Sequence, residues 1–556
     1  MAVKANALLV SLLSIGLLVT GCSNNNDSLN AAATPSSSAS SSPSPETPPA
    51  VTDAAKPNLI VIQLEAFQSF LLNRSAGDQE ITPVLNEFIK ESAYFPRFYL
   101  QNGAGNTSDA EFMANTSLHP LDGGHSIAMD AADKAFPGLP RTLKKEGYAT
   151  LTLHTNNVMF WNRKELYAAL GFDRFYDKSF FGTDNAIAFG ASDDILYEKS
   201  SEVLSQTNQP FYAQLISMSS HYSYKIPDKY QSLTLPAIYE ENMVGDYIEA
   251  AHYADEALGR FFEELQEKKL WDNTVVAIYG DHTGMMMNFV KEKEAAALKE
   301  LLGRDYDQID ALGVPFIVHG PNVKAGQYDT VGGHLDIMPT LADVLNVQPE
   351  GTTFGYDLLK GAEHPVAVRA SFAPAGSFVF GDSYYDTKLK KTTDLPSRKE
   401  IVTDETIQRL AGEVTSRFRQ SDDYIKSLPP KENLYGTKLT VMEKTKAYEQ
   451  KDESSKVVEK FSAGTVIDFF KNDGDWYQYA DDQGNERWIN VPQPMIEVYK
   501  KVHNPKKTKA YVEPDTSSKA PIEVGAQDLY ALKEWNGTGW VQVSTWTGKD
   551  LWINVN

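Results

Sequence analysis

The chain has 556 residues, of which 42% are hydrophobic and 11% aromatic, and its formal net charge is −22. This length predicts more than one hydrophobic core, at roughly 100–200 residues per domain. The acidic balance and the lack of a long basic run exclude nucleic acid as a partner, because phosphate backbones are bound by clustered lysine and arginine.

The N-terminus has the pattern of a bacterial export signal. Lys4 precedes an apolar segment, Ala7–Thr20, which is too short to span a bilayer comfortably. Its end, "VTGCS", resembles the lipobox of bacterial lipoproteins and contains Cys22, the single cysteine of the chain. The resemblance implies a signal peptide over residues 1–22, lipid on the Cys22 sulfur, and a protein anchored to the outer face of the bacterial cell membrane. An ordinary signal peptide with an incidental cysteine is the alternative.

The next segment, residues 23–56, is rich in small and polar residues and nearly lacks bulky apolar ones, so we expect a disordered linker. Order is expected from residue 57, where "NLIVIQL" is typical of a buried parallel strand. Comparable apolar runs follow at Ala149–Thr155, Pro210–Ser217, Asn273–Asp281 and Val314–Pro321.

Amphipathic stretches separate these runs, and residues 377–430 predict one or two further helices that close the domain. Strands that alternate with helices predict an α/β fold with a mostly parallel sheet flanked by helices. Ligands of such sheets lie beyond the carboxyl ends of the strands, so polar residues there are the first candidates for chemistry. The amphipathic stretches are Thr82–Ser92, Val244–Lys268 and Leu335–Val347.

The tail contains an internal repeat. "TKAY" begins at Thr445 and again at Thr508, and "WINV" occurs once in each copy. Because each unit holds short alternating runs and Gly, Asp and Asn turns, we expect two small β-barrels, residues 437–498 and 499–556, which resemble bacterial SH3-like domains. Such domains could contact cell-wall glycan or peptide, and a pair of spacers without a ligand is the alternative.

Four residues with metal-binding side chains fall at the predicted strand ends or at a helix start. Glu65 ends "VIQLE", Asp281 and His282 end "VVAIYGDH", and Thr107 opens a predicted helix after "NGAGN". Two carboxylates, a hydroxyl and an imidazole form an oxygen-rich ligand set that suits Mn²⁺ or Mg²⁺ and, less clearly, Zn²⁺. Each alone has a structural explanation, since a threonine before a helix is commonly an N-cap. Together they predict a metal site.

A divalent cation would also give Thr107 a chemical role. Its hydroxyl is a poor nucleophile in water, but beside a cation its proton is lost more easily. A helix N-terminus offers N–H groups and a positive dipole end to a phosphate, and Gly103 and Gly105 would let the backbone approach that anion closely. We therefore expect Thr107 to take up a phosphoryl group and pass it on.

Long motifs in this region resemble the extracellular domain of the lipoteichoic acid synthase family, which is part of the alkaline phosphatase/sulfatase superfamily. They include "NLIVIQLEAFQSFLLN", "FYLQNGAGNTSDAEF", "LHTNNVMFWNRKELYAALGFDRFYD", "YGDHTGM" and "GGHLDIMPTLADVLNV", and the match covers residues 57–430. The resemblance implies a sulfatase-like catalytic domain with a metal set, usually for Mn²⁺, and Thr107 as the nucleophile. The implied metal residues are Glu65, Thr107, Asp281 and His282, the implied glycerol-phosphate residues are His154, Trp161, Arg163 and His221, and His334 is placed near the metal.

The function implied by the resemblance is phosphoglycerol transfer. Thr107 would attack the phosphodiester of a phosphatidylglycerol-like lipid, release diacylglycerol, and hand the phosphoglyceryl group to a glycolipid, polymer or glycan acceptor. With water as the acceptor the same site is a phosphodiesterase, and a non-catalytic wall-binding lipoprotein is a third interpretation. Sulfate-ester hydrolysis is set aside, because the residues from Thr107 to Glu111 contain neither the cysteine nor the Pro/Arg pair of typical sulfatases. Three features are expected to depart from the family: typical synthases carry several membrane spans before the catalytic domain where this sequence has one lipid-anchored cysteine, Asn106 stands where members often have Lys, and the tail repeats are an addition. The first departure bears on processive polymer synthesis and not on the chemistry of the site.

Overall fold

A computed structural model describes residues 56–369, 371–432, 437–481, 485–545 and 549–556. The predicted signal peptide, Cys22 and all but the last residue of the predicted linker therefore lie outside the described residues. Within the ranges given, no helix combines the length and the apolar character needed to cross a membrane.

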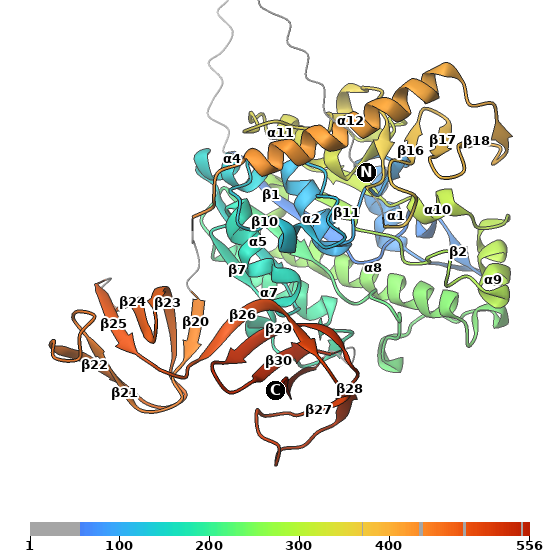
Figure 1. Cartoon of the computed structure of the whole chain (residues 1–556). Helices are drawn as coiled ribbons and strands as arrows, with labels where there is room; N and C mark the ends of the chain where they lie inside the picture. Colours follow the sequence, from blue (N-terminus) through green and yellow to red (C-terminus); the bar gives the residue numbers. More distant parts are fainter. Residues whose placement is uncertain (1–55, 370, 433–436, 482–484, 546–548) are drawn as a thin grey trace, which may run out of the picture. The chain divides into compact units, whose positions relative to one another are not determined.

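Eight strands form the central sheet, and all five strands expected from apolar runs belong to it (Figure 1). β1 lies in the interior of the sheet, parallel to β11 and β10, and the parallel pairing continues to β6 and β7. In sheet order the strands are β13 (Gly326–Gln327), β4 (Ala93–Tyr94), β12 (Phe316–His319), β11 (Thr274–Gly280), β1 (Asn58–Leu64), β10 (Phe211–Ile216), β6 (Ala149–His154) and β7 (Arg174–Tyr176).

Both faces of this sheet are buried, which explains why its strands read as continuous apolar runs. Alternate residues of β1 enter two different hydrophobic clusters: Leu59 and Val61 belong to one, and Ile60 and Ile62 to the other. A helical layer therefore covers each face, which confirms the predicted α/β architecture. One layer contains α2 (Thr107–Thr116), α4 (Leu139–Lys145), α5 (Arg163–Leu170) and α11 (Ile337–Val344), and the other contains α1 (Pro83–Lys90), α7 (Asp193–Ser205), α8 (Met243–Glu267) and α9 (Glu292–Leu302).

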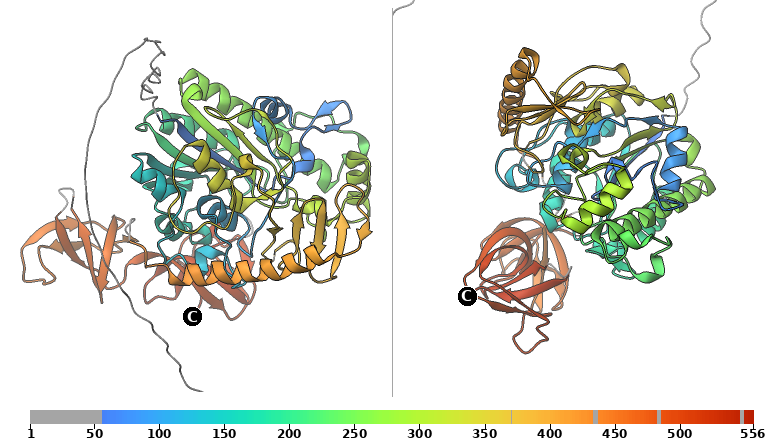
Figure 2. Two further views of the ribbon diagram at one scale, coloured as in Figure 1. Left: turned by 90° about the horizontal axis from the view of Figure 1, so that it is seen from above. Right: turned by 90° about the vertical axis from the view of Figure 1, so that its right-hand side faces the viewer.

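One strand of the central sheet, β12, and a second, smaller sheet are antiparallel. β12 runs antiparallel to both β11 and β4. The second sheet packs through Phe378 and Tyr385 on a single long helix, α12 (Glu405–Ser427), which Figure 2 shows along the outside of the α/β region. Its strands are β15 (Val366–Ala367), β16 (Phe378–Phe380), β17 (Ser383–Asp386), β18 (Lys391–Asp394) and β19 (Glu400–Ile401).

The C-terminal region is built of antiparallel β-strands, as the repeat predicted. Each copy has its own hydrophobic cluster, while β26 spans the predicted boundary between the copies and pairs with β20 and β29. In sheet order the strands are β22 (Val457–Phe461), β21 (Thr445–Tyr448), β25 (Glu486–Asn490), β24 (Trp476–Ala480), β23 (Val466–Asp473), β20 (Thr437–Thr440), β26 (Met495–Asn504), β29 (Gln527–Trp535), β30 (Trp540–Ser544) and β31 (Asp550–Asn554).

The repeat is also visible in side-chain packing. In the first copy Tyr448 meets Trp476 edge to face, with ring centroids 5.7 Å apart. In the second copy Tyr511 meets Trp540 in the same way at 5.6 Å. Equivalent aromatic pairs in equivalent places indicate that the two copies share one local structure.

Candidate functional site

Glu65 and Asp281 are brought together by strand register. Leu64, the last residue of β1, lies opposite Gly280, the last residue of β11, in a parallel pair. The next residues, Glu65 and Asp281, therefore leave the same edge of the sheet side by side. His282 follows directly, and this edge is the carboxyl edge at which ligands of α/β sheets bind.

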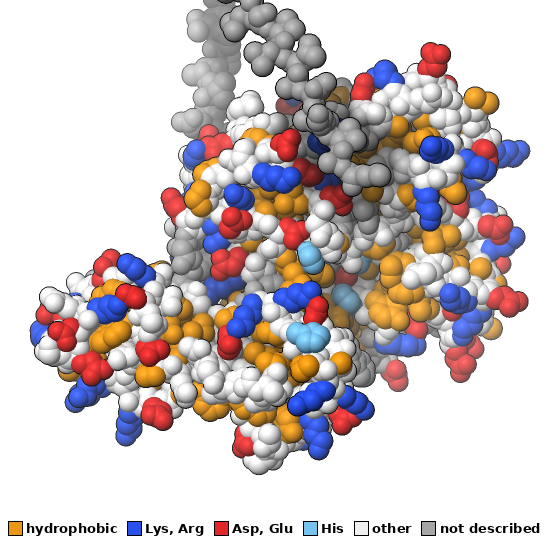
Figure 3. All heavy atoms as spheres, in the orientation of Figure 1, with side chains coloured by type: hydrophobic (Ala, Val, Ile, Leu, Met, Phe, Trp, Pro, Cys, Tyr) orange, Lys and Arg blue, Asp and Glu red, His pale blue; other side chains and the backbone are white. Residues whose placement is uncertain are grey.

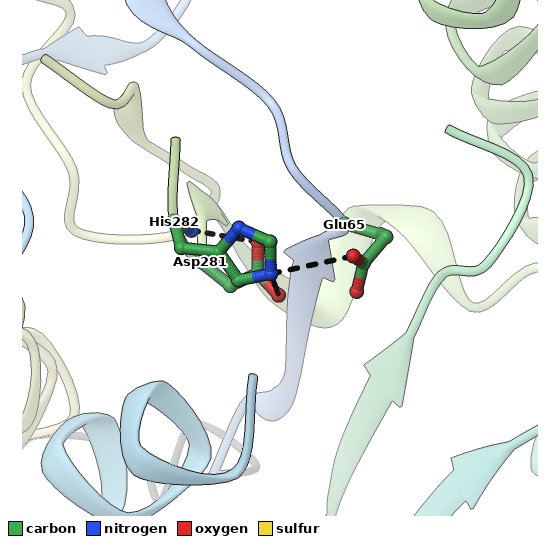
Figure 4. Close-up of side chains that lie close together, drawn as sticks. All are labelled: Glu65, Asp281 and His282. Carbon is green, nitrogen blue, oxygen red and sulfur yellow. Dashed lines mark hydrogen bonds and ion pairs between the residues drawn. The ribbon is translucent and has the colours of Figure 1, made fainter. Parts of the chain in front are cut away.

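Three of the four predicted metal residues, Glu65, Asp281 and His282, converge in space (Figure 4), and Thr107 lies beside them. One ligand atom from each of Glu65, Asp281 and His282 lies within 4.8 Å of the other two. His282 Nε2 is 3.3 Å from Glu65 Oε1 and 3.7 Å from Asp281 Oδ2. Thr107 Oγ1 lies 3.3 Å from Glu65 Oε2 and 3.5 Å from His282 Nε2. Two carboxylates, one imidazole and one hydroxyl thus face a common point.

The chemistry of these donors fits a divalent cation. Glu65 Oε1 and Asp281 Oδ2 are buried and accept no hydrogen bond from the described residues, and such orphaned carboxylate oxygens are costly without a cationic partner. The second oxygen of Asp281 accepts hydrogen bonds from the backbone N–H groups of Ala66 and His282, both at 2.7 Å. His282 Nδ1 donates to the carbonyl of Thr283, which directs Nε2 toward the carboxylates.

Protonation of the buried groups reflects the crowding of charge. Burial, and then the neighbouring Glu65, raise the pKa of Asp281 to about 8. Burial opposes ionisation of Glu65 as well, but His221 and His282 hold its pKa down to about 2. Burial disfavours a charged His282, yet Asp281 and Glu65 raise its pKa to about 10. In the metal-free protein, protons on Asp281 and His282 thus offset the negative charge of the site. A bound cation would take the place of these protons.

The loop before Thr107 is shaped by Asp109. Its Oδ2 accepts a hydrogen bond from the backbone N–H of Gly105 at 2.9 Å. A Cβ atom on Gly103 or Gly105 would lie 2.8 Å or 2.3 Å from an Asp109 carboxylate oxygen. The glycines are thus needed for close packing around Asp109, a reason that the sequence did not reveal. Asn106 has a positive φ of 41°, so the backbone is strained directly before the candidate nucleophile.

Two predicted substrate histidines share one hydrogen-bonding pattern. His154 Nδ1 donates to the carbonyl of Ile216 at 2.9 Å, and His221 Nδ1 donates to that of Tyr222 at 2.7 Å. His221 Nε2 lies 3.9 Å from Glu65 Oε1, so this ring borders the metal residues. Burial, followed by Arg163, lowers the pKa of His154 to about 3, which keeps this imidazole neutral.

Trp161 and Arg163 lie where β6 leads into α5. Trp161 is half-buried, has a positive φ of 58°, and packs edge to face on Phe160. Arg163 is buried, and its Nε and Nη2 both lie 2.7 Å from Glu111 Oε1. Tyr167 donates to the other oxygen of Glu111 at 3.1 Å. Sequence reasoning missed Glu111, because nothing in a helical "DAEF" indicates a partner 52 residues away.

His334 lies against Gly280, the residue directly before Asp281, and both of its ring nitrogens meet backbone groups. Its Nε2 donates to the carbonyl of Gly280 at 2.9 Å, and its Nδ1 accepts from the N–H of Gln101 at 3.4 Å. Burial lowers the pKa of His334 to about 4. With both ring nitrogens bound to backbone, His334 holds the end of β11 in place rather than offering a lone pair to a metal.

Comparisons with known proteins agree on one group of relatives. Residues 57–347 match the sulfatase family. Lipoteichoic acid synthase 1 of Bacillus subtilis (strain 168) is 35% identical over 399 residues, which are 68% of this chain and 61% of that protein. Lipoteichoic acid synthase of Staphylococcus aureus (strain USA300) is 32% identical over 345 residues, 60% of this chain and 51% of that protein. The chain thus spans about half to three fifths of the length of these relatives.

Solved structures resemble the same region. The crystal structure of the lipoteichoic acid synthase LtaP from Listeria monocytogenes superposes with a TM-score of 0.64 and 34% identity, covering 68% of this chain and 94% of that one. A protein in the alkaline phosphatase superfamily from Vibrio parahaemolyticus gives a TM-score of 0.55 at 21% identity, covering 68% of this chain and 90% of that one, and shares the fold.

Proposed function

Because this chain belongs to the lipoteichoic acid synthase family of the alkaline phosphatase/sulfatase superfamily, we propose that it is a metal-dependent phosphoglycerol transferase. The substrate is phosphatidylglycerol or another phosphoglycerol-bearing lipid, and the acceptor is a glycolipid, polymer or glycan in the synthesis of lipoteichoic acid or a related cell-envelope polymer. The observation that carries the proposal is the Thr107 hydroxyl, which faces Glu65 and His282 within 3.5 Å.

Glu65, Thr107, Asp281 and His282 are the residues that would hold the cation. Their three oxygen donors and one nitrogen donor favour Mn²⁺, with Mg²⁺ or Zn²⁺ as alternatives. Such an ion, when bound, acidifies a neighbouring hydroxyl and offsets the negative charge of a phosphate. The buried carboxylate oxygens that accept no hydrogen bond support this assignment.

In the transfer, Thr107 Oγ1 attacks the phosphorus of the lipid phosphodiester. An Oγ1–P bond forms as Thr107 gives up its hydroxyl proton, while the bond from phosphorus to the diacylglycerol oxygen breaks and the leaving oxygen takes a proton. An acceptor hydroxyl then attacks the same phosphorus and loses its proton, while the Oγ1–P bond breaks and Thr107 Oγ1 regains a proton. The intermediate is a glycerophospho-threonine, and each step exchanges one P–O bond for another.

The histidines divide the remaining roles. The His221 side chain is 30% exposed and borders Glu65, so it can give a proton to the leaving oxygen and recover one from the acceptor. His154 is neutral with a proton on Nδ1, so its Nε2 can accept a hydrogen bond from a glycerol hydroxyl. Trp161 is the candidate wall for the glycerol carbons.

Arg163 and the start of α2 are placed to meet a phosphate. Although Glu111 takes Nε and Nη2 of the guanidinium, Nη1 has no hydrogen bond or ion pair with the described residues. Nη1 of Arg163 can therefore donate to a phosphate oxygen, while Glu111 fixes the plane of the guanidinium. The N-terminus of α2 adds a positive dipole end beside Thr107.

Water is the second acceptor to consider, because the partial exposure of His221 opens the site to solvent. The chain would then be a phosphodiesterase with the same intermediate. A non-catalytic wall-binding lipoprotein fits less well, since buried carboxylate oxygens that accept no hydrogen bond destabilise a protein that makes no use of them.

The parts outside the catalytic region complete the proposal. A lipid on Cys22 would hold the protein at the outer face of the membrane, and residues 23–56 would tether a catalytic domain over residues 57–430. The repeats, residues 437–498 and 499–556, are proposed as SH3-like domains that contact cell-wall glycan or peptide.

The experiment incubates the full chain with Mn²⁺ and fluorescent phosphatidylglycerol and follows labelled diacylglycerol. Thr107→Val keeps the side-chain shape without the hydroxyl and should abolish release, while Thr107→Ser should keep some of it. Thr415→Ala, at an exposed position of α12, is the control and should leave release unchanged. Release by Thr107→Val at the parent rate would contradict the proposal. Adding glycerol or glycolipid then separates transfer from hydrolysis.

A further inference from the structure

Two loops that carry site histidines also carry exposed apolar side chains. Tyr222 follows His221, and its side chain is 48% exposed, while Met287 lies five residues beyond His282 and is 42% exposed. Tyr222 stacks on Phe289 with ring centroids 5.0 Å apart, which joins the two loops. We call Tyr222, Met287 and Phe289 the apolar lip. Figure 3 shows hydrophobic side chains gathered over the region between the labels α8 and α9 of Figure 1.

Aromatic rings also pack on the two imidazoles that lie next to the lip. Phe189 meets the His221 ring edge to face at 4.7 Å. Phe372 stacks on the His282 ring at 5.8 Å with an interplanar angle of 26°. Both imidazoles that border Glu65 are therefore flanked by aromatic rings, and Tyr222 of the lip directly follows His221 in the chain.

Charge around the lip differs from that of the chain as a whole. Residues 283–290, "TGMMMNFV", contain no charged residue, and the next residue is Lys291. Lys291 is exposed and has no carboxylate partner among the described residues, while Lys225, three residues beyond Tyr222, pairs with Asp246 at 2.6 Å. In a chain with a net charge of −22, an uncharged segment that exposes Met287 and is followed by a lysine without a carboxylate partner suits an anionic lipid surface.

We propose that the apolar lip inserts into the surface of a phosphatidylglycerol-containing membrane and contacts the acyl-chain side of the lipid whose phosphate reaches Thr107. The inference rests on the proposed function, because it names where the apolar part of that substrate lies. A phosphodiester sits at the headgroup level, so a site that attacks it must reach the interface. Tyrosine, phenylalanine and methionine side chains are well suited to partial burial there.

The first test measures insertion without turnover. Because Cys22 is the single cysteine, a full chain with Cys22→Ser and Met287→Cys can carry one environment-sensitive fluorophore. Vesicles of phosphatidylglycerol should raise its emission at least about twofold and shift it to shorter wavelength. The matched control is Leu389→Cys, a 63% exposed apolar position on the β17–β18 hairpin, which should not respond. No response at position 287, or equal responses at both positions, overturns the proposal whatever the enzyme does.

The second test links the lip to catalysis. Tyr222→Ser with Phe289→Ser should lower turnover of phosphatidylglycerol in vesicles at least about tenfold more than turnover of a soluble phosphodiester such as bis(p-nitrophenyl) phosphate. Leu389→Ser should leave both rates unchanged. An equal loss on both substrates would assign the lip a structural role and overturn the proposal. If the parent chain turns over neither substrate, the proposed function fails, while the fluorescence result still decides whether the lip enters the membrane.

Discussion

Thr107 Oγ1 lies 3.3 Å from Glu65 Oε2, although 42 positions separate the two residues in the sequence. The contact exists because β1 ends at the carboxyl edge of the sheet and α2 begins there. A hydroxyl and a carboxylate at this distance, with His282 beside them, can share one cation.

Removing one carboxylate should weaken metal binding. Glu65→Gln or Asp281→Asn should raise the dissociation constant for Mn²⁺ at least about a hundredfold, because an amide oxygen is a neutral and weaker donor than a carboxylate. Calorimetric titration measures the change. Asp382→Asn, which breaks only an exposed ion pair with Arg97, is the control and should bind Mn²⁺ as the parent does. Parent-like affinity in Asp281→Asn would remove this residue from the metal set.

Replacing the buried ion pair between Arg163 and Glu111 should affect stability and activity differently. Glu111→Ala leaves the Arg163 guanidinium buried without its partner and should cost about 3–5 kcal/mol of unfolding free energy. Replacing both residues, with Glu111→Leu and Arg163→Met, should recover much of this loss, because no unpaired charge remains. The double variant should nevertheless release no diacylglycerol. Denaturant unfolding and the lipid assay are measured together, and a fully active double variant would show that Arg163 does not meet the phosphate.

Two glycine-to-alanine changes should have opposite effects. In Gly105→Ala the new Cβ would lie 2.3 Å from Asp109 Oδ1, so the loop must shift and carry Thr107 with it. In Gly412→Ala, within α12, the new Cβ meets nothing within 4 Å and should stabilise the helix by about 1 kcal/mol. Thermal unfolding and turnover are compared. If Gly105→Ala retained full activity, the packing of Asp109 against the loop would not position the nucleophile.

Stability should fall as pH rises because of Asp255. Its oxygens accept hydrogen bonds from the N–H groups of Val84 and Leu85, both at 2.8 Å, and burial raises its pKa from 3.8 to about 7. Between these two pKa values the folded chain keeps a proton that the unfolded chain loses. Asp255 therefore lowers the free energy of unfolding by about 1 kcal/mol per pH unit from pH 5 to 6, and it causes no further loss well above pH 7. Asp255→Asn should flatten the dependence over this range in denaturant unfolding.

The control for the pH experiment lies on the same helix. Glu263→Gln changes an exposed carboxylate of α8 and should leave the slope of stability against pH as in the parent. A slope that is the same in the parent and in Asp255→Asn would mean that Asp255 stays ionised in the folded protein.

Much of the fold could be predicted from the sequence because burial on both faces leaves a plain signal. The β1 segment "NLIVIQL" is apolar on both sides of the strand, and helices alternate with such runs. The antiparallel direction of β12 left no such trace, since its "FIVH" run would read the same in either direction. The sheet from β15 to β19 was missed because its strands are two to four residues long, too short for a period-2 pattern.

Some features of the candidate site could likewise be predicted from the sequence, and others could not. Glu65, Asp281 and His282 directly follow long strands, so their meeting could be expected from topology alone. The pairing of Arg163 with Glu111 could not, because it joins two helices through side chains whose sequence context is ordinary. The two hydrogen bonds of His334 to backbone also depend on three segments that only the folded chain brings together.

A crystal of the protein soaked in Mn²⁺, with anomalous diffraction recorded near the manganese edge, tests the central claim most directly. We expect one strong peak about 2.0–2.4 Å from oxygens of Glu65 and Asp281, from His282 Nε2 and from Thr107 Oγ1. A crystal with no peak there, or with an ion that leaves the Thr107 hydroxyl unbound, would contradict that claim.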